Sequence, residues 1–172
     1  NLKGIFLTGT YLPTKIEINL LKFLLGFERL FSSRTNVSRV HKINFQRLNS
    51  FFRNPRTQFD WLAKDENVVD AYIDDNNCGF DCTNSLWCDF IAGNENIMAF
   101  EDLKKLNKEI RIYLAAGKDD PCIQTGSGIK GLFEAFNDSF ENVYLDLYDG
   151  MRHEILNEHC NDELLESFIK FI

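Results

Sequence analysis

The sequence has no cluster of basic residues of the kind that follows a phosphate backbone. Of its 172 residues, 19 are Lys or Arg and 26 are Asp or Glu, so the net charge is −7 at pH 7. This balance argues against nucleic acid as a partner, because such binding depends on clustered positive charge. With 44% hydrophobic and 26% charged residues, the composition is that of a soluble globular domain with a sizeable core.

An uninterrupted apolar run long enough to cross a membrane is also missing. The most apolar stretch, residues 20–31, is broken by Lys22, Glu28 and Arg29. We therefore expect an unusually apolar helix there. It is either a lid that faces substrate or lipid, or a helix of the buried core.

No secretory signal peptide opens the chain, and the number of cysteines is odd. The five are Cys78, Cys82, Cys88, Cys122 and Cys160. The first three lie close together, but they form no C-x-x-C pair and have no histidine nearby, as a zinc site would need. We predict free thiols, without zinc or disulfide, packed as small hydrophobic side chains in a cytoplasmic protein.

Hydrophobic spacing and capping residues predict the order of the elements. Before residue 105 they are a strand at 4–8, a helix after Pro13-Thr14, an irregular stretch at 32–58, a helix at 59–74, a loop at 76–82 and a helix from Thr83 to about Met98. The chain then alternates: a strand at 110–116, a helix with Ile129, Leu132, Phe133 and Phe136 on one face, a strand at 143–148, and a helix capped by Asn161 with Leu164, Leu165, Phe168 and Ile169 facing inward.

This alternation predicts an α/β fold in which parallel strands are joined by crossover helices. Residues 143–148 alternate between apolar and polar side chains. Interior parallel strands are usually apolar throughout, so we place this strand at the sheet edge.

Polar groups follow two of the predicted strands at the point where each ends. Gly-Lys-Asp-Asp-Pro at 117–121 follows the first, and Asp-Gly-Met-Arg-His-Glu at 149–154 follows the second. Functional groups gather at the carboxyl ends of parallel strands, so an Asp from the first loop can reach His153 in the second. A carboxylate orients an imidazole and stabilises its protonated form, which allows general base and acid chemistry near neutral pH. Acidic residues after strands are common, so the pattern by itself is a modest signal.

The two segments resemble the C-terminal signature of the lysophospholipase and monoacylglycerol lipase-like, or serine aminopeptidase-like, α/β-hydrolases. Gly117, Asp120 and Pro121 match G-x-x-D-P, and Gly150, Arg152, His153 and Glu154 match G-x-R-H-E. Further likeness lies in Leu-Thr-Gly-Thr at 7–10, Arg-Thr-Gln-Phe-Asp-Trp-Leu at 56–62, Asp65 and Cys-Gly-Phe at 78–80. The chain departs from the bacterial members at Cys122-Ile123, where they often have Val-Gly, and at Asn77, where they often have Pro.

The resemblance implies part of an α/β-hydrolase fold: a core strand at 1–12, a helical cap at 13–105 and the C-terminal part of the core at 106–172. It makes Asp120 the acid and His153 the base of a Ser-Asp-His triad that needs no cofactor or metal. The residues that compete with them are Trp61 and Trp87, which we expect in the core of the cap, His41, which we expect to be a surface or packing residue of the cap, and His159, which we expect in solvent. Asp119 is set aside because the motif spacing selects Asp120.

The family nucleophile is the Ser of a G-x-S-x-G turn, and no such pentapeptide occurs in this sequence. Gly126-Ser127-Gly128 comes after the acid, whereas the family order is Ser, acid, His. The chain also opens with Asn1 rather than Met and runs at once into a strand. We therefore expect the serine upstream of Asn1, in a missing N-terminal half of the same fold.

These features imply a serine hydrolase of carboxylic esters, with a lysophospholipid or monoacylglycerol as the substrate. The cap would cover the acyl chain and could touch a membrane peripherally. Two alternatives stay open at this point. The chain could be a truncated homologue that acts as a non-catalytic binding module, or a peptidase or small-ester esterase on the same scaffold, since the cap rather than the triad sets substrate choice.

Overall fold

A computed structural model describes residues 2–98, 103–123, 128–158 and 162–171. Its sheet has three parallel strands in the order β1-β2-β3, namely Gly4–Thr8, Arg111–Gly117 and Asn142–Tyr148. Gly4 lies opposite Arg111, and Arg111 lies opposite Asn142. The parallel α/β arrangement and the edge position of β3 are both confirmed, and β2 starts one residue later than predicted.

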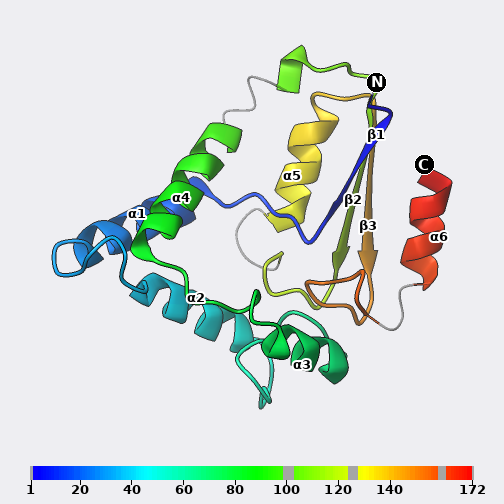
Figure 1. Cartoon of the computed structure of the whole chain (residues 1–172). Coiled ribbons are helices and arrows are strands. Elements are labelled where there is room, and N and C mark those ends of the chain that lie inside the picture. The colour runs from blue at the N-terminus through cyan, green and yellow to red at the C-terminus, as the bar shows by residue number, and fades with distance from the viewer. Residues whose placement is uncertain (1, 99–102, 124–127, 159–161, 172) are drawn as a thin grey trace.

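Helices cover the two faces of this sheet (Figure 1). Helix α5, Gly128–Asn137, packs on one face, and α6, Asp162–Phe171, packs on the other. Alternate residues of β2 supply the two cores: Leu114 and Ala116 face α5, whereas Tyr113 and Ala115 face α6. This double cover explains why β2 is buried almost throughout.

The inward face of α6 differs from the predicted one. Leu164 is fully buried, and Phe168 packs edge-on against Phe6 with ring centroids 4.6 Å apart. Leu165 and Ile169 were expected to face inward, but they are 39% and 71% exposed. The reason is helical geometry, because the stripe that meets the sheet continues from Leu164 and Phe168 to Phe171 at i, i+4 and i+7. The predicted cap, Asn161, lies outside the described residues.

Four further helices lie between β1 and β2, in the region expected to be the cap and called the cap region below: α1, Lys15–Glu28; α2, Arg39–Asn49; α3, Glu66–Asp74; and α4, Asn84–Met98. A short 3-10 helix at Leu103–Lys105 leads back to the sheet. The Thr14 side chain accepts a hydrogen bond from Glu17 N–H and forms a capping box, and Thr83 Oγ1 accepts one from Leu86 N–H. Both predicted helix starts are therefore confirmed. None of the described helices is long and apolar enough to span a membrane.

Two parts of the cap region differ from prediction. Residues 32–58 were expected to be irregular, but they contain α2, which is capped by Ser38 and buries Val40 and Leu48. Its sequence is mostly polar, so it carries little apolar periodicity. Residues 59–74 were expected to be one helix, but α3 begins only at Glu66, because the backbone N–H groups of Lys64 and Asp65 bind a distant carboxylate, Glu158.

Gly117 ends β2 at a point where the chain passes very close to the loop after β3. A Cβ atom at this position would lie 2.0 Å from the Met151 carbonyl oxygen. The same two loops are joined by backbone bonds, from Lys118 N–H to Tyr148 O (2.8 Å) and from Asp119 N–H to Met151 O (3.0 Å). Glycine is therefore required for the two loops that follow β2 and β3 to meet.

We expect Gly117→Ala to destabilise the fold by at least about 3 kcal/mol, since the clash is with backbone and cannot be relieved by a rotamer change. The matched control is Gly93→Ala in α4, where nothing lies within 4 Å of an added Cβ. That variant should be neutral or gain up to about 1 kcal/mol through helix propensity. Urea unfolding of both variants measures the difference, and equal midpoints would contradict the predicted close approach.

Candidate active site

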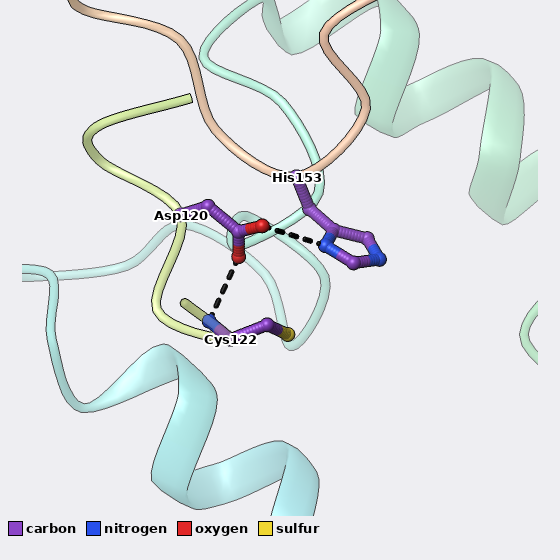
Figure 2. Close-up of side chains that lie close together, drawn as sticks. All are labelled: Asp120, Cys122 and His153. Carbon is purple, nitrogen blue, oxygen red and sulfur yellow. Dashed lines mark hydrogen bonds and ion pairs between the residues drawn. The ribbon is translucent and has the colours of Figure 1, made fainter. Parts of the chain in front are cut away.

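The two loops that follow β2 and β3 bring Asp120 and His153 together. The Asp120 Oδ2 atom lies 2.9 Å from His153 Nδ1 (Figure 2). The Asp120 side chain is completely buried, whereas 27% of the His153 side chain is exposed. This is the predicted contact, at the carboxyl ends of two adjacent parallel strands.

The Asp120 carboxylate is held by its own loop. Its second oxygen, Oδ1, accepts a hydrogen bond of 2.8 Å from Cys122 N–H, and Asp120 N–H donates to the Gly117 carbonyl. Because a carboxylate only accepts, it fixes the imidazole with the proton on Nδ1. The lone pair is then on His153 Nε2, which lies on the side of the ring away from Asp120 (Figure 2). A neutral imidazole so oriented can accept a proton from a hydroxyl.

Two further residues enclose the imidazole, and the sequence analysis identified neither of them as part of a site. The Trp61 ring packs against it, with centroids 5.1 Å apart. Gly9, just after β1, has a φ of +58°, and a Cβ there would lie 3.2 Å from His153 Cε1 and 3.0 Å from the His153 carbonyl oxygen. Trp61 was expected to be cap core: it lies in the segment at 56–62 that resembles the family, but that likeness did not place its ring beside His153. Gly9 is part of the Leu-Thr-Gly-Thr likeness, so its place beside the site could have been suspected.

Cys122 also adjoins the pair, so we considered a metal centre. One donor atom each from Asp120, Cys122 and His153 lie within 4.8 Å of one another. Burial, and then the neighbouring Asp120 carboxylate, raise the pKa of the Cys122 thiol well above its ordinary value. The thiol is therefore protonated at neutral pH, and both Asp120 oxygens already accept hydrogen bonds. These properties fit a hydrogen-bonded Asp120–His153 pair better than a metal site.

The other candidate residues are placed elsewhere. Asp119 is exposed, so the motif spacing selected the buried member of the acidic pair. His41 lies in α2, buried against the Phe45 ring and 3.5 Å from Asp81, and burial lowers its pKa. His159 and Ser127 lie outside the described residues. Cys78, Cys82, Cys88 and Cys122 take part in no disulfide, and Cys160 is not among the described residues.

Comparison with known proteins decides the family. Residues 1–160 match the family model described as serine aminopeptidase, S33. The chain belongs to this family of α/β-hydrolases. The family assignment agrees with the partial α/β-hydrolase fold predicted from the two loop motifs.

Solved structures of α/β-hydrolases show the same fold. A thermostable carboxyl esterase from Bacillus coagulans in complex with glycerol aligns with a TM-score of 0.77 at 24% identity, over 98% of this chain and 56% of that one. A lipase in an open form aligns with a TM-score of 0.66 at 25% identity, over 98% and 56%. A monoacylglycerol lipase from Paleococcus ferrophilus aligns with a TM-score of 0.59 at 17% identity, over 97% and 56%. The chain thus spans a little over half the length of these α/β-hydrolases, and no curated protein sequence matches it significantly.

Proposed function

We propose that Asp120 and His153 are the acid and base of a serine hydrolase that cleaves carboxylic esters. The observation that carries this proposal is the 2.9 Å contact between Asp120 and His153 Nδ1, with Nε2 on the opposite side of the ring. In the proposed reaction a serine hydroxyl attacks the acyl carbonyl while His153 takes its proton and then gives it to the leaving alcohol. Water activated by His153 hydrolyses the acyl-enzyme, and Asp120 stabilises the imidazolium in both steps.

The nucleophile of this proposal lies upstream of Asn1. The 172 residues contain no G-x-S-x-G, and the family order places the serine before the acid. The sheet also has room for more strands on that side: within the described residues, β1 pairs with β2 and has no strand on its other edge. The serine-bearing half of the fold would extend the sheet from β1.

The proposed substrate is an ester with a long acyl chain, such as a lysophospholipid or a monoacylglycerol. Helix α1 packs on α4 through Ile18 and Leu25, but its other side carries an exposed apolar stripe. Its members fall at i, i+4, i+7 and i+11 and are between 55% and 79% exposed: Ile16, Leu20, Phe23 and Phe27. A stripe of this size fits contact with acyl chains or a lipid surface. The lipase and monoacylglycerol lipase among the similar structures agree with this choice.

Replacing Phe23 and Phe27 with Ser in the full-length protein should raise KM for long-chain esters. Removing these two exposed phenyl groups would take away the surface that they bury against the acyl chain, which weakens binding by about 10- to 100-fold. Esters of short acids should be hydrolysed as before. The control is Phe80→Ser, because Phe80 is 61% exposed in the loop before α4. Equal KM values for long and short esters in the double variant would contradict the lipid assignment.

A panel of substrates that extends this comparison of long and short esters separates the remaining alternatives. The family is described as serine aminopeptidase, and one similar structure is a carboxyl esterase, so the panel includes peptide and short-ester substrates. If the protein prefers a peptide substrate, it is a peptidase on the same scaffold. Absence of turnover on every substrate would favour a non-catalytic binding module.

A further inference from the structure

An irregular segment, residues 59–65, lies between the helices of the cap region and the loop that carries His153. It is the last part of the connection from α2 to α3, and its buried residues are Phe59, Trp61, Leu62 and Ala63. Its middle residue, Trp61, packs on the His153 ring. The position of the imidazole therefore depends on where this segment sits.

Arg152, immediately before His153, binds the segment through its side chain. Its Nη1 atom donates to the carbonyl oxygens of Asp60 (2.5 Å) and Ala63 (3.1 Å). The guanidinium lies over the Phe52 ring, 4.0 Å from its centroid. A planar guanidinium can stack on an aromatic ring while its N–H groups donate in the same plane, a geometry that the compact, flexible ammonium of Lys does not reproduce.

Glu158 binds the same segment through main-chain amides. Its carboxylate, only 5% exposed, accepts hydrogen bonds from Lys64 N–H (2.8 Å), Arg152 N–H (3.0 Å) and Asp65 N–H (3.3 Å). A buried carboxylate is stable when backbone donors of this kind surround it. Glu158 thereby joins the segment, some 90 residues earlier in the chain, to the residue before His153.

The residue after His153 is tied to the same place, since Glu154 N–H donates to the Leu62 carbonyl at 2.8 Å. Both chain neighbours of His153 are therefore fixed to the segment whose Trp61 faces the imidazole. These bonds do not involve Asp120, which holds the ring from the other loop.

We infer that Glu158 and Arg152 are positioning residues for His153: they fasten the segment 59–65 to the histidine loop, so that Trp61 and Asp120 together fix the imidazole. This inference rests on the proposed hydrolase function. A shift of about 1 Å in a catalytic group can lower the rate about 100-fold. Loss of the Glu158 or Arg152 contacts with the segment should therefore affect turnover more than substrate binding. The apolar stripe of α1 makes none of these contacts, and KM should change little.

The test uses the full-length protein with Glu158→Ala, Glu158→Gln and Arg152→Lys. We expect Glu158→Ala to lower kcat about 10- to 100-fold with KM nearly unchanged. Glu158→Gln keeps an acceptor for Lys64 and Arg152 N–H but sets an NH2 group against Asp65 N–H, so it should retain more activity than Glu158→Ala. Arg152→Lys should lower kcat because an ammonium cannot stack on the Phe52 ring and hold both carbonyls in the geometry of the guanidinium. The matched control is Glu166→Gln, since Glu166 is an exposed carboxylate on α6 that pairs with Lys170.

A second readout does not depend on turnover. The proton between Asp120 and His153 gives a low-field NMR resonance, which should weaken or shift in Glu158→Ala and persist in Glu166→Gln. Folded Glu158→Ala with wild-type kcat and an unchanged resonance would overturn the inference. If Glu158→Ala does not fold, wild-type kcat in both Glu158→Gln and Arg152→Lys would overturn it. If the wild-type protein hydrolyses no ester, the hydrolase proposal fails separately, and the resonance alone decides whether Glu158 positions His153.

Discussion

Replacing His153 with Ala in the full-length protein is expected to lower kcat by about six orders of magnitude, the scale seen when the base of a serine triad is removed. His153 is the group that would move every proton in the proposed reaction, and no other described histidine lies at the carboxyl end of the sheet. The fold should survive, because His153 is in a loop and 27% of its side chain is exposed. Steady-state kinetics and a thermal melt on the same preparation measure both expectations.

The control is His41→Gln. His41 is buried among Phe45 and Trp87 in the cap region, where it serves packing. Its replacement should lower the melting temperature and leave kcat essentially unchanged. Full activity in His153→Ala, or a loss in His41→Gln that matches it, would refute the assignment of the base.

Asp120→Asn should lower kcat about 10⁴-fold through the tautomer of His153. The amide has the same shape and its oxygen can still accept from Cys122 N–H, so the loop should keep its conformation. Its NH2 group would donate to His153 Nδ1, which moves the imidazole proton to Nε2. Nε2 could then no longer accept the serine proton.

The neighbouring Asp119→Asn variant removes the same charge from an exposed side chain and should be nearly silent. Circular dichroism and kcat for the two variants separate a tautomer effect from a loss of structure. Equal activity in Asp120→Asn and Asp119→Asn would contradict the role of Asp120.

Much of this arrangement could be predicted because its signals are local in the sequence. The apolar run that forms β2, the Thr14 and Thr83 caps and the alternation in β3 each depend on residues next to one another. Asp120 and His153 could be paired because strands joined by one crossover helix can be neighbours, and polar residues after such strands meet at one edge.

The parts that were missed depend on distant contacts. Ala63 and Lys64 are good helix formers, but Glu158 binds the backbone amides of Lys64 and Asp65, and the segment 59–65 is irregular. Likewise, the family likeness at 56–62 includes Trp61 but does not show that its ring meets His153, because the two residues come from different halves of the chain. In α6, Leu165 is as apolar as Leu164, and only the way the helix packs on the sheet decides which one is buried.

The central claim, that Asp120 and His153 serve a serine supplied from outside these 172 residues, is tested most directly by covalent labelling. The full-length protein is treated with a fluorophosphonate, which modifies activated serines, and the modified peptide is located by mass spectrometry. We predict one labelled serine, within a G-x-S-x-G sequence upstream of Asn1, and loss of the label in His153→Ala. Labelling of a serine within residues 1–172, or undiminished labelling in His153→Ala, would contradict the account.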